Sequence, residues 1–160
     1  MDIIRHRLLK INSYLRSISK IKLILLAVLV NTLISFSLGF VADYFFNEEI
    51  TKGSKDLGSF SNAFYVAVLR APIVETVLFQ FAIIEIIKKK YNSFSCCCIS
   101  AFFFGLFHDY NFFYFLFGIF SGLVFAYVYI IEKDIKKGIL YTTLAHMAYN
   151  TVIISLKYLI

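Results

Sequence analysis

The sequence predicts an all-α membrane protein, a polytopic bundle of about five transmembrane helices preceded by an amphipathic helix. Hydrophobic residues make up 60% of the 160 residues and charged residues only 16%, which is more apolar surface than a soluble domain of this size can bury. The apolar residues occur in runs of about 20, the number a helix needs to cross ~30 Å of hydrocarbon. The Lys and Arg residues give a net charge of +6 and lie mostly at the ends of these runs, which fits orientation in a membrane better than nucleic-acid binding.

The first 20 residues form a basic, amphipathic unit, and residues 21–160 form the predicted transmembrane domain. Apolar residues recur at spacings of three and four along the first unit and share one helical face: Ile4, Leu8, Ile11, Leu15 and Ile18. A helix of this kind can lie among the headgroups of an anionic cytoplasmic leaflet. A simple basic leader that only sets topology fits the same residues, and both interpretations stay open.

The crossings are predicted from the apolar runs and their punctuation. Pro72, the only proline, is expected to break the second apolar stretch into a short helix at about 59–69 and a transmembrane helix that begins at the proline. A polar loop is expected at 43–59. The five crossings are then expected at about 22–42, 72–88, 94–108, 112–131 and 139–159.

The distribution of Lys and Arg predicts how the chain is oriented. Most of them lie in the leader, at residues 88–90 and at residues 133–137, which fall on one side of the membrane if there are five crossings. The positive-inside rule makes that side cytoplasmic. We therefore expect a multi-pass protein of the cell membrane with its N-terminus inside and its C-terminus outside.

Four polar residues within the apolar runs are the candidate site. Glu75 is placed where a charge costs roughly 2.5–3.5 kcal/mol on the insertion scale, and ionisable residues in such positions usually face the bundle interior and serve a site. Helix rise, counted from the cytoplasmic ends, puts Glu75 at ~20 Å and His108 at ~21 Å. The same count puts Asn150 at ~18 Å, with His146 one turn below it at ~12 Å. We expect these four side chains to meet.

The segments around these residues form three motifs. They read Glu-Thr-Val-Leu-Phe-Gln from Glu75, Phe-Gly-Leu-Phe-His ending at His108, and His-Met-Ala-Tyr-Asn from His146 to Asn150. Over about residues 60–154 the chain resembles the CPBP family of intramembrane proteases, which includes the CAAX prenyl proteases and bacteriocin-processing or immunity proteins. That family carries Glu-Glu-x-x-x-Arg, Phe-x-x-x-His and His-x-x-x-Asn on successive transmembrane helices. The resemblance implies that the four residues are catalytic and that Phe104 supports them.

The first motif departs from the family at two positions. Thr76 stands where the family has its second Glu, and Gln80 stands where it has Arg. Losing one member of such a pair would strand a charge in a low-dielectric site, whereas losing both leaves the pair neutral. We expect Thr76 and Gln80 to support the site and to hydrogen-bond along their helix.

The residues also suggest a mechanism for hydrolysing a peptide bond. Burial favours the neutral form of a carboxyl, so Glu75 suits a general base that works near neutral pH. His108 can share the attacking water and relay its proton. His146 and Asn150 can offer N–H donors to the developing oxyanion. The sequence therefore predicts an intramembrane endopeptidase that acts on a hydrophobic or lipidated peptide. We expect membrane lipids as its other partners and no binding of nucleic acid.

Several alternatives stay open at this point. Glu75, His108 and His146 would make a two-His, one-carboxylate set for Zn²⁺, while a metal-free glutamate mechanism fits the same residues. A catalytically weakened immunity or scaffold protein of the same fold is favoured by Thr76 and Gln80. A small proton-coupled transporter would use Glu75 and the histidines as a relay, although so short a chain shows no inverted repeat. Richness in Ile, Phe and Lys hints at a bacterial source, and nothing indicates an oligomeric state.

Overall fold

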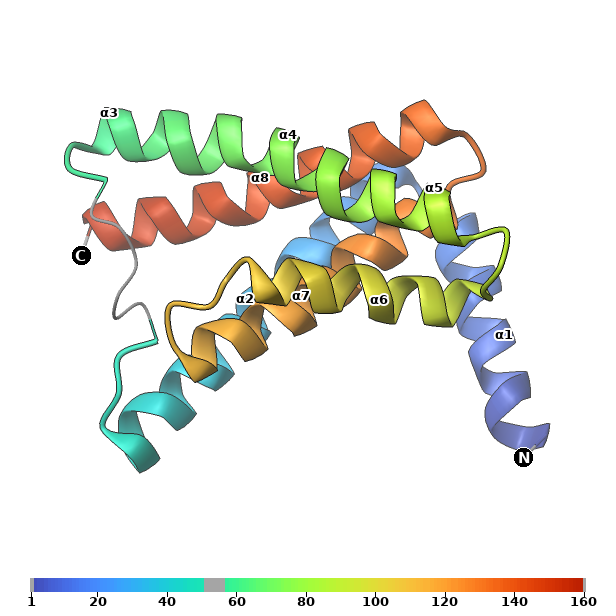
Figure 1. Ribbon diagram of the computed structural model, residues 1–160, viewed down its shortest axis with the longest axis horizontal. Coiled ribbons are helices and arrows are strands. Elements are labelled where there is room, and N and C mark those ends of the chain that lie inside the picture. Colours follow the sequence, from blue (N-terminus) through green and yellow to red (C-terminus); the bar gives the residue numbers. More distant parts are fainter. Residues whose placement is uncertain (1, 51–56, 160) are drawn as a thin grey trace.

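The computed structural model describes residues 2–50 and 57–159, and in this part of the chain it is a bundle of six helices without strands (Figure 1). The predicted all-α membrane bundle is confirmed. The third helix is one continuous segment made of five consecutive elements: α3 (Phe60–Ala63), η1 (Phe64–Arg70), α4 (Ala71–Glu75), η2 (Thr76–Ile83) and α5 (Ile84–Ile87). The other helices are α1 (Asp2–Ser17), α2 (Lys20–Phe46), α6 (Ser93–Leu106), α7 (Phe112–Ile131) and α8 (Ile135–Leu159).

Within the described residues, four helical segments are long and apolar enough to cross a membrane. They are Lys20–Phe46, Phe60–Ile87, Phe112–Ile131 and Ile135–Tyr158. The remaining apolar helix, α6, has 14 residues; at 1.5 Å per residue it spans only ~21 Å, less than the hydrocarbon thickness. The bundle thus has four full-length helices and a shorter fifth, α6, which lies where the sequence predicted the crossing at about 94–108.

The predicted break at Pro72 is wrong, because the helix continues through the proline. Phe64–Arg70 is π-helical, and the Ala71 amide donates to the carbonyl of Val66, five residues earlier. This wider turn changes the hydrogen-bonding register before the proline, so that its missing N–H and its ring are accommodated within a continuous helix. Figure 1 shows α3 to α5 as one unbroken helix.

The connections between helices lie at two ends of the bundle, and those at one end are rich in Lys. The start of α2, the α5–α6 connection and the α7–α8 connection lie together at the right in Figure 1, and we call this the basic end. Its Lys residues are Lys20, Lys22, Lys88, Lys89, Lys90, Lys133, Lys136 and Lys137. The turn between α6 and α7, the residues just before α3 and the C-terminal end of α8 lie at the left, which we call the opposite end.

The N-terminal helix packs on the bundle near the basic end. The Tyr127 hydroxyl of α7 donates to the side-chain oxygen of Asn12 at 3.1 Å. On the predicted apolar stripe, Leu15 and Ile18 pack against the core, whereas Ile11 is 54% exposed. The side chains of Ile4 and Leu8 lie outside the described residues. Among the described residues, the stripe therefore changes from exposed at Ile11 to packed at Leu15 and Ile18.

Small residues bring α6 and α7 into close contact. Gly118 and Gly122 are four apart on α7, which is the spacing that lets two membrane helices approach closely. A Cβ at Gly118 would lie 2.9 Å from the Cα of Gly105 and 2.9 Å from the Cβ of His108. One at Gly122 would lie 2.9 Å from the Cα of Ala101. This contact fixes the end of α6, and with it the turn that carries His108.

Candidate active site

Glu75 and His146 face one another from the middle of two helices. The carboxylate Oε2 of Glu75, at the end of α4, lies 3.8 Å from Nε2 of His146 on α8. The His146 side chain is 5% exposed and that of Glu75 is 19% exposed. The distance exceeds that of a hydrogen bond, and the pair attracts as ions only when the imidazole is protonated. Two polar groups of complementary chemistry are therefore held close together in an otherwise apolar bundle.

The level at which these residues meet differs from the sequence prediction. The sequence placed Asn150 level with Glu75, and His146 a turn below. Because α8 begins at Ile135 rather than near residue 139, His146 lies 11 residues into the helix, or ~16 Å along it. Glu75 lies 12 residues before Ile87, or ~18 Å. His146 is thus level with Glu75, and Asn150 lies one turn further toward the opposite end.

His108 sits in the turn after α6, and its ring is fixed by two contacts to Phe104. Its Nδ1 is 2.8 Å from the Phe104 carbonyl oxygen, and the two rings stack with centroids 4.5 Å apart. A carbonyl oxygen only accepts hydrogen bonds, so Nδ1 carries the hydrogen. In the neutral ring, Nε2 then keeps its lone pair and can accept a proton or a water hydrogen.

Aromatic rings hold His146 in place. Phe125 of α7 stacks on it with centroids 4.4 Å apart and an interplanar angle of 25°. Phe104 meets it edge-on at 5.8 Å. Among the described residues, Nδ1 of His146 has no hydrogen-bond partner. The imidazole is thus positioned by packing rather than by a hydrogen-bonded carboxylate or carbonyl.

Asn150 is tied to the π-helical segment before Pro72. Its side-chain amide Nδ2 donates to the carbonyl oxygen of Ala67 at 2.7 Å. In the register set by Ala71 and Val66, that carbonyl would accept from residue 72. A proline has no N–H to give. Asn150 therefore supplies the hydrogen bond that Pro72 cannot make, and it keeps one further amide hydrogen for a ligand.

The four candidate residues line a single cavity of about 390 Å³, together with Phe104. Side chains that the sequence did not point to line it as well, among them Tyr114, Ser121, Phe125 and Tyr149. Ser121 could have been found from the sequence, because it is a hydroxyl residue beside Gly122 in a very apolar helix. The aromatic residues could not, because the chain contains 19 Phe and 11 Tyr residues and only packing selects those that face the site.

Thr76 and Gln80 do not reach the cavity. Both are fully buried, and neither lines it. The expected hydrogen bond between them is not made, since their side-chain polar atoms have no partner in the described part of the chain. Thr76–Ile83 is π-helical, so the segment does not keep the α-helical register on which the expected pairing was based.

Glu75, His108 and His146 are the candidate ligands for a metal ion. The described residues contain no group of three His, Cys, Asp or Glu side chains that could hold a metal ion together. Glu75, His108 and His146 line the same cavity, and Nε2 of His108 keeps its lone pair, but the three do not form such a group. Zinc dependence stays a prediction.

Comparison with known proteins places the chain in a family. The family model described as type II CAAX prenyl endopeptidase Rce1-like matches residues 58–152, more than half of the chain and all four candidate residues. The chain belongs to this family. The resemblance seen in the motifs is thereby confirmed, and the protein is an integral membrane protein of the Rce1-like CAAX protease family. No curated protein and no solved structure matches the chain.

Proposed function

We propose that the protein is an intramembrane endopeptidase that hydrolyses a membrane-associated or lipidated peptide with a water activated by Glu75. The observation that carries the proposal is the 3.8 Å approach of Glu75 and His146 across a cavity that His108 and Asn150 also line. Membership of an endopeptidase family gives independent support. A carboxylate, two imidazoles and an amide provide a base, a second proton acceptor and two N–H donors, which is what peptide hydrolysis requires.

The cavity can contain the reacting water. A water molecule occupies about 30 Å³ and needs two to four polar partners, and the cavity of about 390 Å³ has these in Glu75, His108 and Ser121. In the proposed step the Glu75 carboxylate takes one proton from the water, while Nε2 of His108 accepts a hydrogen bond from the O–H that remains. The oxygen attacks the peptide carbonyl carbon, and the C–N bond then breaks as Glu75 returns the proton to the leaving amine.

The oxyanion formed in this step needs donors in a water-poor setting. Asn150 uses only one amide hydrogen on Ala67, so its second amide hydrogen can serve the oxyanion. Nε2 of His146 can donate as well in the tautomer that places the ring hydrogen on it. Removing one such donor from a comparable site costs about 10²–10³ in rate. Glu75 and these donors therefore have separable roles, the first in proton transfer and the second in stabilising charge.

The test is cleavage of a peptide by purified protein in lipid, with Glu75→Gln as the variant. The amide keeps the size of the carboxyl but cannot accept the proton, so we expect the cleavage rate to fall by about 10²–10⁴. Glu85→Gln is the matched control, because Glu85 lies on the same helix but contacts Tyr129 and Lys88 instead. Equal activity of Glu75→Gln and wild type would refute the proposal, and a chelator added to the wild type tests for a metal.

A second candidate, a catalytically weakened immunity or scaffold protein, is favoured by the neutral Thr76 and Gln80. The same assay separates it from the first. If the wild type cleaves no peptide while a Thr76→Glu, Gln80→Arg double variant does, the fold is competent and the natural chain is the inactive relative. Activity in the wild type that Glu75→Gln removes excludes this candidate.

A further inference from the structure

The cavity around Glu75 opens toward the opposite end of the bundle. Its lining continues from Glu75 to Ile50, Leu57, Tyr110 and Lys157. These four belong to the connections and the helix end at the left in Figure 1, away from the basic connections. Tyr110 and Lys157 are exposed, so the cavity reaches the surface on that side.

Hydrogen bonds hold the chain around this mouth. The side-chain amide of Asn111, in the turn before α7, donates to the Ile50 carbonyl oxygen at 2.9 Å. The Tyr158 hydroxyl, near the end of α8, donates to the Gly58 carbonyl oxygen at 2.7 Å. The mouth is therefore framed by three parts of the chain that come together only in the folded protein.

Toward the basic end the bundle is closed. Ile84, Val128 and Tyr129 are each less than 5% exposed and pack in the core below the site. The Tyr129 hydroxyl donates to Glu85 at 2.8 Å, which ties α7 to α5 at that end. None of these side chains lines the cavity. Water and substrate thus have a path to Glu75 from one end and a packed core at the other.

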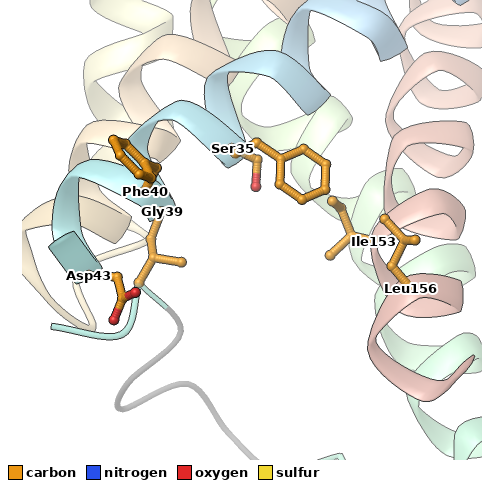
Figure 2. A pocket seen from close by; sticks show the side chains of 8 residues that line it. Ser35, Gly39, Phe40, Asp43, Ile153 and Leu156 are labelled. Carbon is orange, nitrogen blue, oxygen red and sulfur yellow. The ribbon is translucent and has the colours of Figure 1, made fainter. Parts of the chain in front are cut away.

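A lateral groove between α2 and α8 adjoins the cavity on its open side. Figure 2 shows its walls, with Ser35, Gly39, Phe40 and Asp43 on one helix facing Ile153 and Leu156 on the other. The groove has a volume of about 430 Å³ and is apolar apart from Ser35 and Asp43. Ser35, Ile50 and Ile153 line both the groove and the cavity. A hydrophobic segment lying in the bilayer can therefore pass between the two helices to the site.

The charges indicate which membrane face this open side meets. Eight Lys residues lie at the basic end. At the opposite end, the described charged residues include Lys157 together with Asp43, Glu48, Glu49 and Asp109, which belong to the end of α2, the residues after it and the α6–α7 turn. The positive-inside rule puts the basic end in the cytoplasm. We propose, resting on the endopeptidase function proposed above, that the site faces outward and that its substrate is a hydrophobic peptide held in the outer half of the bilayer, reached through the groove between α2 and α8. A lipidated tail presented on the cytoplasmic face would meet the closed end.

The orientation is tested by labelling, without reference to activity. In a background with Cys96, Cys97 and Cys98 changed to Ala, single cysteines are placed by Glu48→Cys, Lys157→Cys and, as the opposite-face control, Lys89→Cys. All three positions are exposed. We expect a membrane-impermeant maleimide to label the first two and not the third in intact cells, and the reverse in inside-out vesicles. Labelling of the control alone in intact cells would overturn the proposal.

The substrate class is tested with the unaltered chain, so folding of the cysteine variants does not limit it. An acylated fluorogenic peptide is added to right-side-out and to inside-out vesicles, and vesicles carrying Glu75→Gln give the background. We expect cleavage to be about tenfold faster in right-side-out vesicles than in inside-out vesicles. This ratio corresponds to a difference of ~1.4 kcal/mol in the free-energy barrier to cleavage. Faster cleavage in inside-out vesicles overturns the proposal.

The two proposals fail in different ways. Outward labelling without Glu75-dependent cleavage on either side overturns the endopeptidase function and the substrate class, and leaves the outward orientation standing. Glu75-dependent cleavage confined to inside-out vesicles supports the endopeptidase function and overturns the outward site.

Discussion

At the scale of single residues, Asn150 compensates for the hydrogen bond that Pro72 cannot make. The proline leaves the Ala67 carbonyl without its backbone donor, and the Asn150 amide donates to that carbonyl at 2.7 Å. A member of the family's His-x-x-x-Asn motif thus also holds the helix that carries Glu75. We therefore expect an Asn150 variant to lose the position of that helix as well as the proposed oxyanion donor.

A double-mutant cycle separates these contributions. Asn150→Ala leaves a half-buried carbonyl unpaired, which should lower the free energy of unfolding by about 1–3 kcal/mol. In a Pro72→Ala background, residue 72 has an N–H that can pair with Ala67, so the same change should cost about 1 kcal/mol less. Unfolding in lipid or detergent measures both.

Equal costs in the two backgrounds would show that the proline does not set the need for the amide. Asn150→Asp provides a further comparison, because a carboxylate has no hydrogen to donate to Ala67. It should be at least as destabilising as Asn150→Ala in the background that keeps Pro72, because the carboxylate also brings a charge next to the carbonyl oxygen.

Thr76 and Gln80 show why the altered motif is tolerated. They match the family's second Glu and its Arg, yet both are fully buried beside the cavity rather than in it. A charge left alone there would be costly, and two neutral side chains avoid that cost. The groups that line the cavity are unaffected, since Glu75 and both histidines are retained.

At the scale of elements, the α6–α7 contact sets where His108 lies. Gly118→Ala would put a Cβ 2.9 Å from both the Gly105 Cα and the His108 Cβ, so the helices must separate. We expect the free energy of unfolding to fall by about 1–3 kcal/mol, the usual cost of overpacking a core. We expect the rate of peptide cleavage to fall as well, because His108 moves. Thermal unfolding and the cleavage assay measure the two effects.

The control for this prediction is a glycine with space around it. A Cβ at Gly39 meets only the Ile50 side chain at 3.8 Å, an ordinary contact, so Gly39→Ala should leave stability within about 0.5 kcal/mol. If Gly118→Ala were as stable as Gly39→Ala, close packing of α6 on α7 would not be what positions His108.

The whole molecule decides how a substrate arrives, because the groove and the cavity join only where α2, α8 and the chain at Ile50 meet. Gly39→Phe should fill the groove between α2 and α8 without disturbing the core. We expect cleavage of a membrane-held peptide to fall relative to that of a short water-soluble peptide by about tenfold, or ~1.4 kcal/mol. The ratio of the two rates is the measured quantity.

Leu33→Phe is the matched control for the groove. Leu33 is on the same helix and 58% exposed, but it does not line the groove. The same added bulk at that position should leave the ratio of rates unchanged. An unchanged ratio in Gly39→Phe as well would exclude the groove as the route of the membrane-held peptide.

Much of the fold follows from local sequence, and α7 shows why. Its predicted bounds, 112–131, match the structure, because Asn111 caps its first turn by accepting from the Tyr114 amide and charged residues follow its last. The break at Pro72 was wrong for the opposite reason. A proline inside a helix is accommodated by a change of register and by a donor from α8, 78 positions further along the chain, which no local rule contains.

The sequence by itself determined the class of the protein, the order of its helices, the family and four polar residues that line one cavity, because hydrophobicity and motif spacing are properties of neighbouring residues. Only the tertiary structure decided that His146 rather than Asn150 lies level with Glu75, that Asn150 donates to Ala67, and that the cavity opens away from the basic end. These outcomes depend on where helices distant in sequence begin and how they pack. The packing depends on contacts between side chains that lie far apart in the sequence, so no single stretch of sequence determines it.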